Sequence, residues 1–277
     1  MVAETGSTAE SGKSATPKTR TVRFRITRQD GPGKPKRVEQ FDVQVEPGAN
    51  VISCLQQIAS NPVTVDGKKT TPVVWDANCL EEVCGACTMR INGKVRQACS
   101  CLLDEYAPND GDVITLEPMT KFPVYRDLFV DRSRLFHNLI RIRGWVPIDG
   151  TYDLGAGPPA TIRNQELRYP LSQCMSCGCC LEACPQFQLV TNESDWDSSF
   201  IGANIIGQAR YFNTHETGKE LIGERMEVLS GPGGISDCGN AQNCVKVCPK
   251  EIPLTEAIGA VGRSLTVYSI SSFFTGK

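Results

Sequence analysis

The cysteines are the most informative residues of this sequence, because soft thiolates at defined spacings bind iron or zinc. The densest run lies at 174–185 and reads Cys-Met-Ser-Cys-Gly-Cys-Cys-Leu-Glu-Ala-Cys-Pro. Its first three ligand candidates, Cys174, Cys177 and Cys180, are separated by two residues each. Cys184 follows after three more residues, and Pro185 comes directly after it. With this spacing the first three thiolates hold one iron–sulfur cluster and the fourth ligates a second cluster. The run therefore predicts another cysteine set elsewhere in the chain.

That second set consists of Cys238, Cys244 and Cys248, with Pro249 next. Its middle ligand is missing, since Ala241 stands where a cysteine would bind iron. The count predicts a four-thiolate [4Fe–4S] site made of Cys174, Cys177, Cys180 and Cys248. It also predicts a three-thiolate [3Fe–4S] site made of Cys184, Cys238 and Cys244. The alternative at this last site is a [4Fe–4S] cluster whose labile iron is held by water or a non-cysteine ligand.

A third constellation lies nearer the N-terminus. It has the four-then-two spacing of plant-type ferredoxins, whose four thiolates hold [2Fe–2S]. Its members are Cys79, Cys84, Cys87 and Cys99. The small residues Gly85 and Ala86 let backbone amides approach the sulfurs, and such hydrogen bonds raise the reduction potential. Cys101 competes with Cys99 for the fourth position. Eleven of the 14 cysteines are then ligands, and the other three are interpreted as packing residues: Cys54, Cys101 and Cys179.

Composition restricts the protein class. The chain has 277 residues, 40% of them apolar and 22% charged, which is ordinary for a globular protein of about two domains. Its net charge of −2 gives no broad attraction to nucleic acid. No apolar run reaches the roughly 18 residues of a membrane span. Residues 1–20 lack the apolar stretch of a signal peptide, which argues against disulfides, and we expect them to form a disordered tail.

The region from 21 to 120 has the pattern of a small mixed sheet with one helix across it. Apolar residues alternate at 21–27 and 41–45, and 88–91 and 94–97 flank the turn Asn92-Gly93, so we expect two hairpins. Strands are also predicted at 72–75 and 113–117. Asn50 can cap a short helix whose apolar side carries Val51, Leu55 and Ile58.

The region from 121 to 277 is predicted to be mostly α-helical, which makes the whole chain α+β. Residues 121–123 look like a linker, and a helix is expected over 127–142, with its arginines on a solvated face: Arg132, Arg134, Arg141 and Arg143. Helices are also expected between the cysteine runs, where 200–212 is the most apolar stretch, and over 252–261.

No catalytic constellation accompanies the cysteines. Neither His137 nor His215 has a ligand or catalytic partner at a useful spacing, and we find no P-loop, no GxGxxG at a strand–helix junction and no Ser–His–Asp set. Three clusters without substrate machinery indicate an electron relay. We therefore predict no catalytic residues in this chain.

These motifs together resemble the iron–sulfur subunit of succinate dehydrogenase and fumarate reductase. The resemblance extends over about 20–265 and depends on 79–87, Cys99, 174–185, 238–250 and the segment Lys-Phe-Pro-Val-Tyr-Arg-Asp-Leu at 121–128. It implies a β-grasp, plant-type ferredoxin domain followed by a helical, bacterial-ferredoxin-like domain with two clusters. It also implies electron flow from a flavoprotein subunit carrying FAD through [2Fe–2S], [4Fe–4S] and [3Fe–4S] to membrane quinone. The setting would be the tricarboxylic acid cycle and the respiratory chain.

The resemblance further implies a cytochrome b membrane anchor and a location on the cytoplasmic face of a bacterial inner membrane. The family's quinone pocket corresponds to Pro185, Leu189 and Gly239 here. Many ubiquinone-using members have Trp and His at the last two positions, so this chain is more similar to members that use menaquinone and one haem-bearing anchor. A fumarate reductase running in reverse and a soluble multi-cluster ferredoxin are the alternatives. A more distant alternative is a protein-interaction module that is stabilised by bound zinc.

Overall fold

The first hairpin is built on the alternation of apolar residues predicted from the sequence. The computed structural model describes residues 19–147 and 158–275, and in it β1 (Arg20–Arg28) pairs antiparallel with β2 (Arg37–Val45). Phe24 lies opposite Phe41, and both side chains are buried. Alternate residues of a strand point to opposite faces, so this register puts one apolar face of both strands into the core.

Three further strands complete a mixed sheet in the order β2-β1-β5-β3-β4. The strand β5 (Val113–Glu117) runs parallel to β1, whereas β3 (Thr88–Ile91) pairs antiparallel with β5 and with β4 (Lys94–Gln97). Asn92 and Gly93 have φ values of 50° and 76° at the tight turn. Two left-handed residues are what a two-residue hairpin turn requires, so the predicted hairpin is confirmed.

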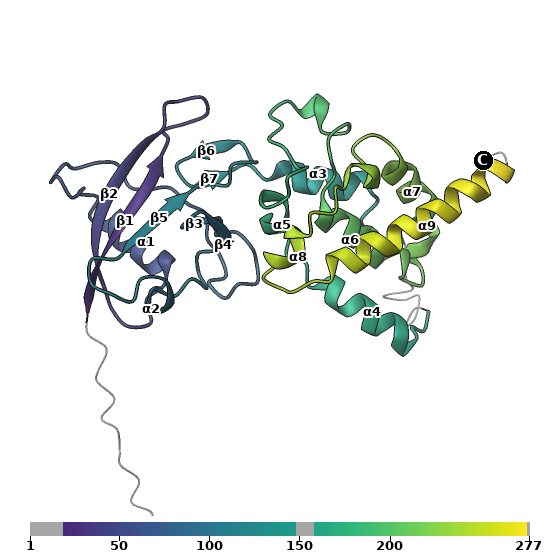
Figure 1. Ribbon diagram of the computed structural model, residues 1–277, viewed down its shortest axis with the longest axis horizontal. Helices are drawn as coiled ribbons and strands as arrows, with labels where there is room; N and C mark the ends of the chain where they lie inside the picture. The colour runs from purple at the N-terminus through teal and green to yellow at the C-terminus, as the bar shows by residue number, and fades with distance from the viewer. Residues whose placement is uncertain (1–18, 148–157, 276–277) are drawn as a thin grey trace, which may run out of the picture.

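One helix crosses the sheet as expected. It is α1 (Val51–Ser60), and Asn50 caps it reciprocally with Ser53. Val51, Leu55 and Ile58 are buried against the sheet, and a short α2 (Leu103–Tyr106) follows the last cysteine loop. The mixed sheet with its crossing helix confirms the predicted fold of the first part (Figure 1).

Two predictions around the connection to the second part are wrong, and Asp127 explains both. Residues 72–75 form no strand, because backbone groups of Val74 bond to Asp127 and Leu128 instead of to a sheet neighbour. Asp127 has φ +48°, which no α-helix accepts, and it lies in the turn between β6 (Val124–Arg126) and β7 (Phe129–Val130). The helix expected over 127–142 therefore begins only at Ser133, as α3 (Ser133–Arg141).

The second part is helical, and α6 (Ala203–Asn213) lies at its centre with most of its residues buried. The long α9 (Leu254–Thr275) packs along α6 and then projects beyond the domain (Figure 1). The helix expected over 252–261 begins two residues later than predicted and is the first part of α9. The remaining elements are α4 (Ile162–Ser172), α5 (Cys179–Glu182), η2 (Glu193–Asp195), η3 (Gly218–Leu221), α7 (Ile222–Ser230), η4 (Ile235–Asp237) and α8 (Asn243–Lys246).

The expectation of a solvated arginine face on α3 is wrong for two of its residues. Arg134 is 5% exposed and donates to the carbonyls of Gln188 and Phe200. Arg132 donates to the carbonyls of Gly85 and Ala86. Loops leave many carbonyls without backbone partners, and a guanidinium can satisfy several of them at once.

Two hydrophobic clusters correspond to the two parts. The first contains the sheet and α1 and extends to Leu128, and the second begins at Met119. The boundary predicted at 120/121 lies where the two clusters overlap. The predicted tail is mostly outside the described residues, as is most of the Gly/Pro-rich segment at 148–157. Among the residues described, no helix is long and apolar enough to span a membrane.

Candidate iron–sulfur centres

The loop from 79 to 87 wraps its backbone amides around cysteine sulfur. Cys79 Sγ accepts hydrogen bonds from the amides of Glu81, Val83 and Cys84 at 3.3–3.4 Å. These donors lower the pKa of the Cys79 thiol to about 7, because they favour the thiolate. Left-handed residues at Leu80, Glu82 and Gly85 curl the chain so that the amides point inward. A thiolate held in this way is suited to bind iron.

Cys99, rather than Cys101, joins the other thiols of this loop. The amide of Cys99 donates to Cys87 Sγ at 3.5 Å, and both residues are buried. Cys101 instead interacts with Arg96 and Glu105, and burial raises the pKa of its thiol to about 11. The geometry thus brings Cys79 next to Cys84 and Cys87 next to Cys99, which is the donor set that [2Fe–2S] needs.

A second group of thiols lines one cavity in the helical part. Four come from the run that begins at 174 and one comes from the last run: Cys174, Cys177, Cys179, Cys180 and Cys248. A side-chain hydrogen bond from Cys179 lowers the pKa of Cys177 to about 7, whereas burial raises the pKa of Cys180. Four of these five thiols are the ligands predicted for a [4Fe–4S] cluster, and the fifth is Cys179.

A third group lines a separate cavity, and it contains three thiols: Cys184, Cys238 and Cys244. Ala241 lies on the wall of the same cavity, between Asn240 and Gln242, which both have positive φ. Lys121 Nζ donates to the carbonyl of Cys184, so a cation from the connecting segment lies beside this site. The donor set fits a cluster with three thiolate ligands and no cysteine at its fourth corner.

Each cavity takes ligands from both cysteine runs, as the sequence spacing predicts. No three of the His, Cys, Asp or Glu side chains in 19–147 and 158–275 converge closely enough to hold a single metal ion. A cluster differs from a single ion because its thiolate ligands are distributed over two or more irons and need not converge on one point. When bound, such clusters supply one-electron transfer at potentials set by charge, hydrogen bonds and burial.

The first and second thiol groups meet across the domain boundary. A Cβ placed on Gly85 would lie 2.7 Å from Cys177 Cβ, and Gly85 also has φ +72°. Only glycine permits both the backbone conformation and the approach. The loop of the first group therefore contacts a ligand candidate of the second group directly.

The three residues predicted at a quinone pocket do not all lie together. Pro185 and Gly239 line the cavity of the third thiol group, but Leu189 lines a different cavity of about 510 Å³ with Phe122 and Thr191. Sequence reasoning missed Gln186, whose Nε2 would lie 2.6 Å from a Cβ at Gly239. Gln186 occupies the space into which a longer side chain at 239 would extend.

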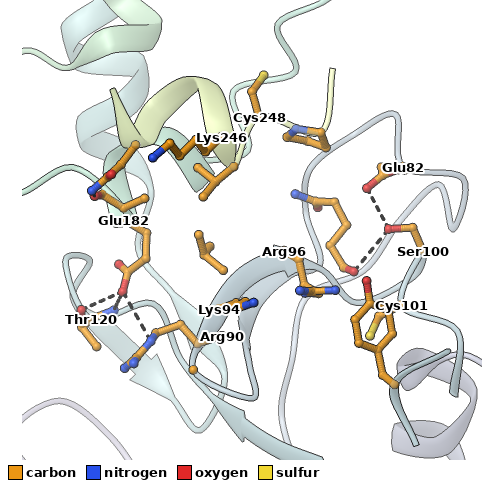
Figure 2. Close-up of a pocket in the computed structure, with 18 residues that line it drawn as sticks. Glu82, Arg90, Lys94, Arg96, Ser100, Cys101, Thr120, Glu182, Lys246 and Cys248 are labelled. Carbon is orange, nitrogen blue, oxygen red and sulfur yellow. Dashed lines mark hydrogen bonds and ion pairs between the residues drawn. The ribbon is translucent and has the colours of Figure 1, made fainter. Parts of the chain in front are cut away.

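A cavity of about 820 Å³ separates the β3–β4 hairpin from α8 on one side of the domain boundary. Figure 2 shows Arg90, Lys94 and Arg96 on the hairpin side and Lys246 and Cys248 on the opposite side. Glu182 at its edge accepts hydrogen bonds from the amide and hydroxyl of Thr120 (Figure 2). Cations of both domains therefore lie near the second thiol group, and nearby positive charge raises a cluster's potential.

Comparison with known families agrees with this arrangement. Residues 23–137 match the family described as "2Fe-2S iron-sulfur cluster binding domain". Residues 170–252 match the family described as "4Fe-4S dicluster domain". Each match contains the cysteines assigned above to the corresponding type of cluster.

Full-length relatives extend the comparison. The succinate dehydrogenase iron–sulfur subunit of Bacillus subtilis strain 168 is 50% identical over 255 residues, covering 92% of this chain and 96% of its own. The fumarate reductase iron–sulfur subunit of Haemophilus influenzae is 30% identical and covers 65% of this chain and 70% of its own. The corresponding Wolinella succinogenes subunit is 26% identical, with 88% and 96% coverage.

A solved structure shows the same fold. A chain of the Mycobacterium smegmatis Sdh1 complex in the apo form aligns with a TM-score of 0.75 over 91% of this chain and 98% of its own, at 20% sequence identity. The α+β fold, with a ferredoxin-type domain followed by a helical dicluster domain, is thereby confirmed.

Proposed function

The chain belongs to the family of succinate dehydrogenase iron–sulfur subunits, and we propose from this membership that it is the electron-relay subunit of a membrane-bound succinate dehydrogenase. The observation that carries the proposal is 50% identity over 92% of the chain to the Bacillus subtilis subunit. The chain transfers electrons and supplies no dicarboxylate active site. The relay operates in the tricarboxylic acid cycle and the respiratory chain.

The relay consists of three clusters arranged one after another as a linear electron-transfer chain. We assign [2Fe–2S] to Cys79, Cys84, Cys87 and Cys99, [4Fe–4S] to Cys174, Cys177, Cys180 and Cys248, and [3Fe–4S] to Cys184, Cys238 and Cys244. The amide donors to Cys79 and the two separate thiol-lined cavities support these assignments.

Low-temperature EPR tests the assignment. The oxidised complex should show the signal of a three-iron cluster, and reduction with dithionite should add [2Fe–2S] and [4Fe–4S] signals. An EPR-silent oxidised state, with two [4Fe–4S] signals after reduction, would disprove the three-iron site.

The partners are a flavoprotein that carries FAD and a cytochrome b anchor that carries haem. The FAD supplies a two-electron donor at one end of the relay, and a quinone accepts electrons at the other end. The complex lies on the cytoplasmic face of a bacterial inner membrane. Co-purification tests this arrangement: solubilised membranes should yield the chain with both partners, whereas recovery of the chain alone after a salt wash would favour a soluble carrier.

Succinate oxidation is favoured over fumarate reduction, because identity to the succinate dehydrogenase relative is 50% and identity to the Haemophilus fumarate reductase relative is 30%. Direction follows the potentials of donor and acceptor. The purified complex should therefore show a higher rate of succinate oxidation with its native quinone than of fumarate reduction with the corresponding quinol.

Menaquinone is the proposed quinone. Leu189 and Gly239 stand where many ubiquinone-using members have Trp and His, and Gln186 fills the space beside Gly239. Pro185 and Gly239, beside the third thiol group, are the proposed quinone-pocket residues, whereas Leu189 lines a separate cavity. The complex should reduce menaquinone analogues faster than ubiquinone analogues, and the opposite preference would refute this assignment.

A further inference from the structure

A buried asparagine without a hydrogen-bond partner lies on the wall of the cavity that the second thiol group lines. It is Asn204, the second residue of α6. Asn204 is 4% exposed, and its Oδ1 has no hydrogen-bond partner. Among the described residues, none accepts a hydrogen bond from its Nδ2. Leaving a buried polar group unpaired destabilises a fold, so packing alone does not explain an asparagine at this position.

The rest of this wall makes the amide of Asn204 distinctive. Met175, Ile252 and Leu254 give the cavity an apolar surface beside its thiols. Ser176 and Lys250 also line it, but both are only partly buried. A hydrogen bond in such a place is electrostatically stronger than one in water. The two N–H donors of an asparagine side chain do not titrate, so Asn204 offers the cavity a donor at every ordinary pH.

The glycine before α6 determines how the amide is oriented. A Cβ placed on Gly202 would lie 3.1 Å from Asn204 Oδ1, and Gly202 has φ +99°. The oxygen of the amide is therefore packed against the turn that precedes the helix. Because the oxygen and the NH₂ group of a planar amide diverge, the NH₂ group faces away from this turn.

The helix that carries Asn204 also favours an anionic group in this position. No side chain caps the N-terminus of α6. The first amides of a helix have no partner within it and carry a partial positive charge. Ala203 lines the third thiol cavity and Asn204 lines the second, so this end of α6 lies between the two sites. A cluster with thiolate ligands is anionic and is the kind of group that such a helix end stabilises.

We propose that Asn204 is a binding residue of the second cluster, which donates an Nδ2–H to a cluster sulfur and thereby raises the reduction potential of that cluster. This role depends on the [4Fe–4S] assignment proposed above. In the step concerned, one electron leaves the [2Fe–2S] cluster and one electron enters the [4Fe–4S] cluster, with no proton transferred. A hydrogen bond to sulfur stabilises the more negative, reduced cluster, so it favours arrival of the electron.

Two variants of the assembled, cluster-loaded complex test this role. Asn204→Leu removes the donor and keeps a similar bulk. Asn138→Leu is the matched control, because Asn138 is also a buried asparagine whose Oδ1 lacks a partner. Its Nδ2, however, donates to the carbonyl of Ile201 at 3.2 Å, and Asn138 does not line either of the two cavities. The measurement is a redox titration of the [4Fe–4S] EPR signal, with iron content and melting temperature determined in parallel.

The expected result is a downward shift of the [4Fe–4S] midpoint in Asn204→Leu, whereas Asn138→Leu should titrate close to the wild type. A purely structural role would change the melting temperature of Asn204→Leu without moving the midpoint, and that result would overturn the inference. An equal downward shift in Asn138→Leu would overturn it as well, because the effect would then not be specific to the cavity wall.

A measurement on the wild-type complex keeps the inference testable if Asn204→Leu does not assemble. The complex is produced with asparagine that carries ¹⁵N only in its side-chain amide, and pulsed ENDOR is recorded on the reduced [4Fe–4S] cluster. We expect a ¹⁵N coupling, and its absence would overturn the inference. Absence of any [4Fe–4S] signal from the wild-type complex would instead refute the proposed function.

Discussion

At the level of single residues, the type of the third cluster depends on Ala241. The residue lies on the wall of the cavity that Cys184, Cys238 and Cys244 line, and its methyl group cannot bind iron. Its neighbours Asn240 and Gln242 both have positive φ, so the backbone of this loop is already shaped for a ligand at the intervening position. One substitution should therefore supply the missing ligand.

We expect Ala241→Cys to convert the three-iron cluster into a [4Fe–4S] cluster. The EPR signal of the oxidised three-iron cluster should be lost, and a second reduced [4Fe–4S] signal should appear. Ala241→Val adds similar bulk without a thiol and should keep the oxidised signal. If that signal persists in Ala241→Cys, position 241 does not face the open corner.

A second residue, Asp127, holds the connection between the domains. Its carboxylate accepts hydrogen bonds from Arg28 Nε at 2.9 Å and from the amides of Gln29 and Val74 at 3.0 Å. Both Asp127 and Arg28 are fully buried. Without Asp127, Arg28 would keep only Glu39 as an anionic partner, and the amides of Gln29 and Val74 would lose their acceptor. Loss of buried charged and hydrogen-bonding partners is far more costly than loss of an exposed pair.

Asp127→Ala should destabilise the first domain by about 3–5 kcal/mol, the usual cost of breaking a buried pair. Asp127→Asn should cost less, because asparagine tolerates positive φ and still accepts hydrogen bonds. Chemical denaturation followed by circular dichroism measures both effects. Equal stability of the alanine variant and the wild type would contradict the role assigned to this carboxylate.

At the level of elements, the C-terminal end of α9 exposes large apolar side chains to a degree that is rare on the surface of soluble proteins. No charged residue occurs from 264 to 275, and Phe273 and Phe274 are 83% and 80% exposed. Val267 and Ile270 are exposed as well, so apolar side chains surround the helix end. Large apolar side chains that are exposed together in this way normally mark a surface that a partner covers. The proposed membrane anchor supplies such a cover.

Replacing Phe273 and Phe274 together by serine should weaken attachment to the anchor. The double variant should release more of the flavoprotein and iron–sulfur subunits from washed membranes than the wild type does, with cluster content unchanged. Ser269→Ala on the same helix is the control and should behave like the wild type. Unaltered retention of the double variant would show that the helix end does not contribute to docking.

At the level of the whole molecule, each of the two thiol-lined cavities in the helical domain is lined by cysteines of both runs. Cys248 shares its cavity with the first run, and Cys184 shares its cavity with the last run. The chain between them contains α6, the buried centre of the helical domain. Each cluster therefore links segments that are far apart in the sequence, and loading with iron should stabilise the domain as a unit.

If each cluster takes ligands from both runs, replacing a cysteine of one run should abolish the cluster that is held mainly by the other run. Cys248→Ala should abolish the [4Fe–4S] signal while leaving the oxidised three-iron signal, although the other three ligands of that cluster lie more than sixty residues earlier. Cys184→Ala should do the reverse. EPR and iron analysis of the two variants measure this. If each variant instead lost the cluster of its own run, the assignment would be wrong.

Local sequence patterns were sufficient to predict much of the fold and the candidate sites of this protein. Ligand spacing, the alternation in β1 and β2, the Asn92-Gly93 turn and the Asn50 cap depend on neighbouring residues, so the sequence alone predicts the cluster sites, the mixed sheet and the helical second domain. The missing ligand at Ala241 is visible in the same way. These features together were enough to indicate the family.

The tertiary structure decided the features that depend on distant partners. Arg134 is buried and Arg132 is partly buried because loops far away in the sequence offer unpaired carbonyls. Asp127 ends a predicted helix because Arg28 and Val74 bind its carboxylate. The contact of Gly85 with Cys177 and the separation of Leu189 from Pro185 follow from how the two domains pack. Periodicity and spacing describe only neighbours along the chain, whereas these contacts are set by burial and hydrogen bonding between segments that folding brings together.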